Sequence, residues 1–144
     1  MTGGLMNSAM ARFLLLLTLL CGAPVVFADW IKMGGNDSVD AYMDLKLLDK
    51  KGNYVMSWRL YDYRSPQKTS SGKTFRSAAT MDVTNCADRT EAMTLFIQYE
   101  QPMGKGNIVA SNKLPQSQWE IKRITPHSVG EALAKVACGR YKMW

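Results

Sequence analysis

Residues 128–139 most restrict the folds open to this chain, because local chemistry sets the start, the buried face and the end of this segment. Ser128 followed by Glu131 is a capping box, in which side chains bond backbone N–H groups that the first helical turn leaves unpaired. Apolar residues then recur at the spacing of one helical face, at Val129, Ala132, Leu133, Val136 and Ala137. Gly139 suits the left-handed residue that often follows a helix. We therefore predict a helix over residues 128–139, docked through this face.

Alternating apolar and polar side chains predict that the other elements are β-strands. The pattern covers residues 42–48, 54–61, 75–83, 93–99 and 119–124, and the short apolar segments 30–33 and 108–110 are predicted as an edge strand and a returning hairpin strand. Tight turns join these segments, whereas residues 64–72 lack apolar side chains and predict a solvated loop. Because no helical crossover connects neighbours, the sheet should be antiparallel. The predicted fold class is α+β, an antiparallel β-sheet of about six strands with one C-terminal α-helix packed on it, near the small residues Ser77 and Ala79.

The first 28 residues have the pattern of a secretory signal peptide. Arg12 precedes an apolar run over residues 13–20, and Ala28 ends a small-residue cleavage site. The run is too short for a membrane span, so we expect no transmembrane segment after cleavage. A lipid-carrying Cys21 is the alternative, but the bulky Leu20 before it disfavours that modification. We predict a single domain over residues 29–144 in the periplasm, with the outer membrane or cell surface as the alternative.

Two cysteines, Cys86 and Cys138, remain in the predicted mature chain. An even number of widely spaced cysteines in an exported protein is typical of structural disulfides. A redox-active pair would normally show C-x-x-C spacing, which is absent. We therefore predict a disulfide between Cys86 and Cys138.

The charge of the chain is concentrated in one region. Removing Arg12 leaves 17 Lys and Arg against 12 Asp and Glu, a net charge of +5. Residues 44–76 alone contain eight basic and three acidic residues, together with several aromatic residues. This mixture suits a protein partner or an anionic ligand, and a solvated face is the structural alternative. Export argues against nucleic acid as the natural partner.

No catalytic or metal-binding motif occurs in the sequence. His127 is the only histidine, and its place just before the capping Ser128 needs no catalytic explanation. Glycine-rich nucleotide motifs, H-E-x-x-H and G-x-S-x-G are all missing. We expect no cofactor, no metal and no enzymatic activity, with an unrecognised secreted enzyme as the alternative.

The order of short motifs resembles the surface-adhesin protein E family of Gram-negative bacteria. The motifs are Trp30, Tyr42-Met43-Asp44, Val55-Met56-Ser57-Trp58, Arg76-Ser77 before Cys86, Trp119-Glu120-Ile121, and Pro126-His127-Ser128 before the helix that reaches Cys138. The resemblance implies an antiparallel sheet with a helix, and a non-enzymatic envelope module that binds host extracellular-matrix or plasma proteins. A soluble periplasmic accessory protein, binding an envelope component or anionic ligand, is the second reading. Whether the protein forms a homodimer stays open.

We predict that the partner binds at the first hairpin and the loop after it. If the helix covers one face of this hairpin, the opposite face should carry Arg59 and Tyr61. Near the centre of a contact, arginine and tyrosine contribute more affinity than rim charges do. The predicted contact residues are Lys46, Lys50, Lys51, Arg59, Tyr61, Arg64, Lys68 and Lys73.

Overall fold

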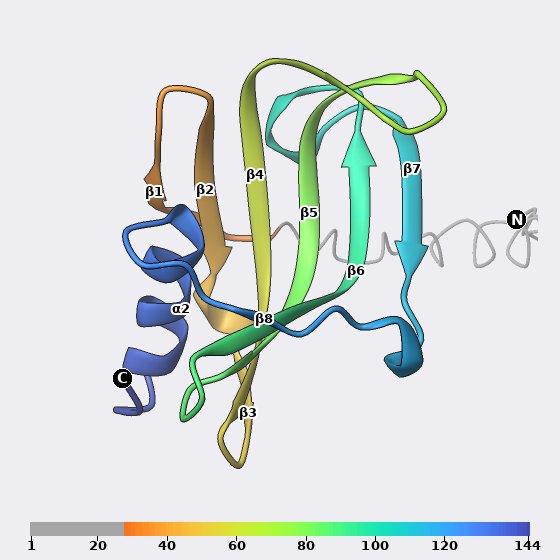
Figure 1. The fold of residues 1–144 in the computed structure, drawn as a ribbon. Coiled ribbons are helices and arrows are strands. Elements are labelled where there is room, and N and C mark those ends of the chain that lie inside the picture. The colour runs from red at the N-terminus through yellow and green to blue at the C-terminus, as the bar shows by residue number, and fades with distance from the viewer. Residues whose placement is uncertain (1–27) are drawn as a thin grey trace, which may run out of the picture.

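The computed structural model describes residues 28–144, which form an antiparallel β-sheet with one α-helix (Figure 1). The main strand order is β1-β2-β4-β5-β6-β7, while β3 pairs with β4 and β8 pairs with β6. The strands are β1 (Trp30–Gly35), β2 (Val39–Asp44), β3 (Asp49–Lys51), β4 (Tyr54–Lys68), β5 (Thr74–Asn85), β6 (Thr90–Tyr99), β7 (Ile108–Lys113) and β8 (Lys122–Arg123). All of these pairings are antiparallel. The predicted fold class is confirmed.

Helix α2 (Val129–Gly139) begins at the predicted cap. The Ser128 hydroxyl accepts a hydrogen bond from the Glu131 N–H at 3.1 Å, and the Glu131 carboxylate accepts one from the His127 N–H at 2.9 Å. The carboxylate therefore bonds one residue earlier than in the standard capping box. The predicted left-handed conformation at Gly139 is wrong, because Lys142 has the positive φ after this helix. The chain continues past Gly139 in a further turn instead.

The main core lies between α2 and one end of the sheet, where β1, β2 and β4 meet the helix (Figure 1). Its fully buried members include Ala41 and Met43 from β2, Val55 from β4, and Leu133 and Ala137 from α2. The prediction that the helix packs against the small residues of 75–83 is wrong. Those residues belong to β5, whereas the helix covers its neighbours on the β1 side.

The predicted disulfide between Cys86 and Cys138 is present, with the two Cα atoms 5.8 Å apart. Cys86 follows the end of β5 and Cys138 lies in the last turn of α2. The bond therefore holds one end of the helix without placing it over β5. Both cysteines are buried in the core.

Several predicted element boundaries are wrong, and each has a local cause. The strand predicted over 42–48 ends at Asp44, because the Asp44 carboxylate accepts the Lys46 N–H at 2.9 Å and starts the 3-10 turn η2 (Leu45–Leu47). The predicted loop over 64–72 is largely strand, since β4 runs on to Lys68 opposite β5. Two further 3-10 turns are η3 (Pro102–Gly104) and η4 (Gln116–Gln118).

The predicted signal peptide lies outside the described residues, apart from Ala28. The lipidation question at Cys21 lies outside them as well. Among residues 28–144, no helix is long and apolar enough to cross a membrane.

Candidate binding groove

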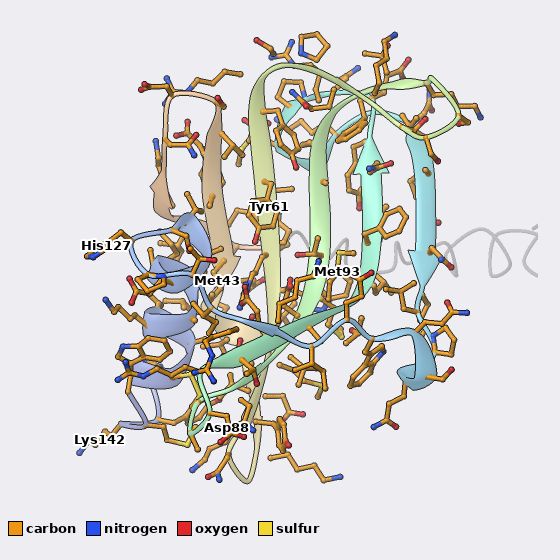
Figure 2. All side chains as sticks on the ribbon, viewed as in Figure 1. Met43, Tyr61, Asp88, Met93, His127 and Lys142 are labelled. Carbon is orange, nitrogen blue, oxygen red and sulfur yellow. A yellow bond between two sulfur atoms is a disulfide. The ribbon has the colours of Figure 1, made fainter. Side chains whose placement is uncertain are left out.

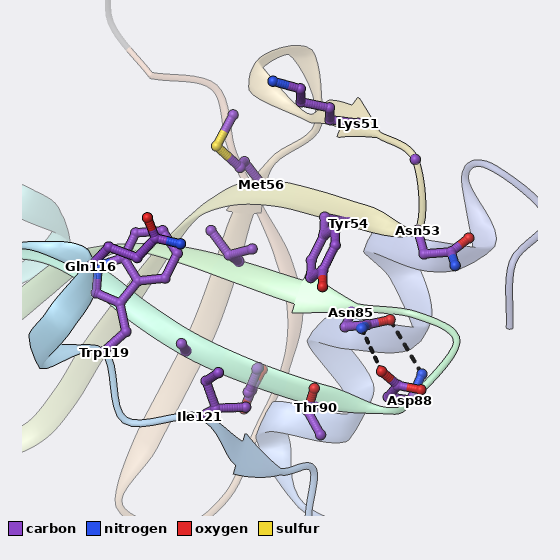
Figure 3. Close-up of a pocket in the computed structure, with 14 residues that line it drawn as sticks. Lys51, Asn53, Tyr54, Met56, Asn85, Asp88, Thr90, Gln116, Trp119 and Ile121 are labelled. Carbon is purple, nitrogen blue, oxygen red and sulfur yellow. Dashed lines mark hydrogen bonds between the residues drawn. The ribbon is translucent and has the colours of Figure 1, made fainter.

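An open groove of about 910 Å³ lies on the sheet face opposite α2 (Figure 3). Its floor is a row of three apolar side chains across the central strands, Met56 of β4, Val83 of β5 and Ala92 of β6. We call it the aromatic groove, and its lining residues are Lys51, Gly52, Asn53, Tyr54, Met56, Val83, Asn85, Asp88, Thr90, Glu91, Ala92, Gln116, Trp119 and Ile121.

Two aromatic side chains from distant parts of the chain form walls of the groove. Tyr54 starts β4 and is 50% exposed, and Figure 3 shows it on the opposite side of the floor from Trp119. Trp119 directly follows η4, and its indole N–H donates to the Leu114 carbonyl at 3.0 Å. This bond satisfies the polar edge of the indole internally, so that the ring offers the groove an apolar surface. Ile121 adds an apolar side chain that is 72% exposed.

The polar rim of the groove contains a pre-organised pair, Asn85 and Asp88. The Asn85 side-chain oxygen accepts the N–H groups of Ala87 and Asp88 at 3.1 and 3.2 Å, and its amide donates to Asp88 Oδ2 at 2.7 Å. Figure 3 shows this pair at the end of the groove near Tyr54. Within the described part of the chain, no hydrogen bond reaches the other carboxylate oxygen, Asp88 Oδ1. The groove therefore presents one fixed acceptor.

The charges that line the groove carry no positive excess. Lys51 supplies one ammonium group and Asp88 one carboxylate. The carboxylate of Glu91 is 2.8 Å from the guanidinium of Arg59, which pairs its charge. Lys50, the neighbour of Lys51 in β3, does not line the groove, and its ammonium lies 5.7 Å from the ring centre of Tyr141.

Arg59 belongs to a buried polar network on the face that carries α2. Its side chain is 1% exposed and donates to Ser57 at 3.1 Å, to Thr84 at 3.0 Å and to Glu91 at 2.8 Å. Asp82 lies 3.9 Å from the guanidinium. Burial would lower the pKa of Arg59, but the carboxylates of Asp82 and Glu91 outweigh it and raise that pKa. Arg59 therefore stays charged and holds the strands together.

The prediction that Arg59 lies on an exposed face is wrong, and strand register explains the error. Arg59 is directly opposite Met43 in the pairing of β2 with β4, so both side chains point to the same face. Met43 is in the core under α2. Alternation along β4 separates the two faces correctly, but only the register shows which of them meets the helix.

Tyr61 lies on the same face as Arg59 and packs against the edge of the core under α2 (Figure 2). It is half-buried and lines a smaller hollow of about 350 Å³ with Tyr63, Met93 and Phe96. Burial is the main cause that raises the pKa of Tyr61 to about 12. Because part of the Tyr61 side chain is exposed, a partner can reach it, and its role in partner binding stays a prediction.

The other predicted contact residues do not form one surface, because they are spread along the whole length of β4. Lys50 and Lys51 pair with Val55 and Tyr54 at its start, whereas Lys68 ends it and Lys73 follows in the next turn. Lys46 lies in η2, between the pairings of Met43 with Arg59 and of Asp49 with Met56. At about 3.3 Å per residue, the two ends of β4 are on the order of 40 Å apart. Arg64 is also at the second end, where it binds Asp40 at 3.2 Å. Their roles in binding stay predictions, but no single compact partner segment can touch all of them.

His127 is exposed and has a left-handed φ of 59° at the start of α2. Within residues 28–144, no three His, Cys, Asp or Glu side chains gather in a way that could hold a metal ion. The sequence pattern indicated aromatic residues within 44–76, a stretch that includes Tyr54, but it did not indicate the groove. Trp119 was assigned to a strand, and only its contact with Leu114 brings it to the wall of the groove.

These features define a class of protein, a disulfide-linked α+β domain with an antiparallel sheet and an open aromatic groove. The sequence profile of the surface-adhesin protein E family matches residues 30–139, and the chain belongs to this family. Membership indicates an adhesin-like surface protein. The resemblance predicted from the sequence motifs is therefore confirmed.

Solved structures of protein E from Haemophilus influenzae share the fold. A second crystal form of that protein aligns with a TM-score of 0.60 and 16% identity, covering 81% of this chain and 91% of that one. Protein E from a non-typeable strain aligns with a TM-score of 0.57 and 16% identity, covering 85% and 83% of the two chains. No curated protein matches the sequence significantly. At this identity the structural likeness shows the fold alone.

Proposed function

We propose that this protein is an exported binding module of the bacterial cell envelope that attaches to host extracellular-matrix or plasma proteins through the aromatic groove. The proposal includes removal of residues 1–28 and a position in the periplasm or at the cell surface. The adhesin-like family supports the class of function. The aromatic groove supports the proposed position of the binding site on the molecule.

The single observation that carries the proposal is the exposure of apolar side chains around one preformed groove. Tyr54 and Ile121 are 50% and 72% exposed, and they belong to segments far apart in sequence. Large apolar side chains that gather at one concave site, bordered by polar groups, are typical of binding sites. Aromatic residues in such a site often contribute most of the binding free energy.

The test compares a double serine variant in the groove with a single serine variant outside it. Tyr54→Ser with Ile121→Ser removes two exposed side chains from the groove. Ile108→Ser removes an apolar side chain that is 60% exposed on β7, outside the groove. Binding of each protein to immobilised matrix extract and to plasma proteins is measured by surface plasmon resonance.

We expect the groove variant to bind at least about tenfold more weakly than the parent, as loss of central aromatic contacts does in other interfaces. The Ile108→Ser variant should bind like the parent. Circular dichroism must show that both variants are folded. Parent-like binding by a folded groove variant would place the contact surface elsewhere. If the parent protein binds neither the matrix extract nor the plasma proteins, the proposed function is wrong.

The same assay tests the basic residues at each end of β4. Replacing Lys50 and Lys51 by alanine changes the end next to the groove, and replacing Lys68 and Lys73 changes the far end by the same charge. The proposal predicts a larger loss for the first pair, because only Lys51 lines the groove. Equal losses would mean that net charge rather than the groove guides binding.

A further inference from the structure

We propose that the ligand of the aromatic groove is a neutral oligosaccharide, carried by the host glycoprotein. This inference rests on the proposed function, because it names the chemical class that the same groove takes. Four properties of the groove support this inference: its apolar aromatic side chains, its polar rim, its charge balance and the backbone pairing of the strands in its floor.

The platforms suit the apolar faces of sugar rings. A pyranose ring has C–H groups on its faces and hydroxyl groups around its edge, so it packs best on a flat side chain that is apolar over a wide area. Tyr54 is half exposed, and Trp119 has its N–H bonded to Leu114, which leaves the ring as an apolar surface. The groove volume of about 910 Å³ is within the range of about 300–1,000 Å³ that is usual for ligand pockets.

The rim suits ligands with many hydroxyl groups. Asn53, Thr90 and Gln116 each contain a donor and an acceptor, and Asp88 Oδ1 is an acceptor held in place by Asn85. A hydroxyl group can donate and accept at once, so it can satisfy every one of these groups. A lipid chain would cover them without hydrogen bonds, which is costly for polar groups removed from water.

Charge complementarity favours a neutral glycan over a sulfated one. The charged groups that face the groove are the ammonium of Lys51 and the carboxylate of Asp88, because the Glu91 carboxylate lies on the α2 face, paired with Arg59. A chain of sulfate groups would meet Asp88 without a matching excess of cations. Lys50, which could have added positive charge, lies over the ring of Tyr141 instead.

The floor of the groove also disfavours an extended peptide. It is built from β4, β5 and β6, whose backbone groups pair with one another across the floor residues. A peptide lying there could not add a strand to the sheet, and its own N–H and C=O groups would lose water without backbone partners. An oligosaccharide has no such backbone groups.

The first experiment is a glycan array with the oxidised parent protein, followed by calorimetric titration of the neutral oligosaccharide that binds best. Heparin serves as the polyanionic comparison. We expect binding to neutral galactose- or N-acetylglucosamine-containing chains, with an affinity that changes less than about twofold between about 50 and 500 mM salt, since screening acts on charge contacts. Asp88→Asn should weaken it about fivefold or more, and Tyr54→Ser about tenfold or more, whereas Ile108→Ser should not. Absence of binding to all neutral chains, or preference for heparin with strong salt dependence, would overturn the inference.

The second experiment separates this inference from the proposed function. Host matrix and plasma glycoproteins are treated with glycosidases and then tested against the parent and the groove variant of Tyr54 and Ile121. Loss of parent binding after treatment supports the oligosaccharide ligand. If the parent binds treated and untreated proteins equally while the groove variant binds neither, the groove recognises protein and only the glycan inference fails. If the groove variant binds untreated glycoproteins as the parent does, the proposed function fails as well.

Discussion

Replacing Arg59 by methionine should cost the protein about 3 kcal/mol of unfolding free energy, even though methionine preserves much of the packing volume. The Arg59 side chain is 1% exposed, and its loss leaves the carboxylates of Asp82 and Glu91 without their cation. Breaking a buried ion pair from one side typically costs about 3–5 kcal/mol. We expect the lower end of that range, because the Glu91 side chain is 23% exposed and can regain water.

The matched control for this substitution is Arg64→Met. Arg64 also binds a carboxylate, at 3.2 Å from Asp40, but its side chain is 56% exposed. An exposed pair of this kind contributes about 0–1 kcal/mol. Urea unfolding followed by tryptophan fluorescence, on the oxidised proteins, gives both values from the same midpoint and slope analysis.

A pH series gives the Arg59→Met prediction a second test. Burial already raises the pKa of Asp82, and Arg59 is the cation that opposes this rise. A carboxyl group whose pKa is raised in the folded state stabilises the fold at low pH and loses that contribution as pH rises through its folded pKa. Without Arg59 the pKa of Asp82 should rise further. The loss of unfolding free energy in Arg59→Met, relative to the parent, should therefore shrink as the pH falls into the acidic range. A deficit equal to that of Arg64→Met, or one unchanged by pH, would refute this reasoning.

Three further predictions use the same unfolding assay. Replacing Cys86 and Cys138 by alanine should cost about 4 kcal/mol, because the bond closes a loop of 52 residues, and an unchanged midpoint would contradict that estimate. The pKa of Tyr61 is about 12, above its ordinary value of 10.0, so its contribution to stability should fall by about 2 kcal/mol as the pH rises from 10 towards 12. Tyr61→Phe should lose this part of the pH dependence, and equal slopes for both proteins would be the opposing result. Ser128→Ala should cost about 1 kcal/mol through loss of the helix cap, whereas the exposed Ser71→Ala should change little.

The elements that depend on local chemistry were predictable from the sequence alone. The capped helix at Ser128 and the antiparallel order of neighbours joined by tight turns were found where the sequence indicated. Most strands with clear alternation were found as well, but the strand predicted over 42–48 ends at Asp44, and of the strand predicted over 119–124 only Lys122–Arg123 forms. Each of these depends on side chains within a few residues of one another. The disulfide between Cys86 and Cys138 was also predictable, because only two cysteines remain in the expected mature chain.

The tertiary structure decided which face of the sheet meets the helix, and this choice determined where a partner can bind. The sequence separates the Arg59 and Met56 faces of β4, but both contain apolar and polar side chains. Only the pairing of Met43 opposite Arg59 places Arg59 in the interior, since residues paired across neighbouring strands share a face. Trp119 reaches the groove in the same non-local way, since its segment crosses to the strand ends near Tyr54. Contacts between distant segments depend on register and chain path, which local side-chain patterns do not encode.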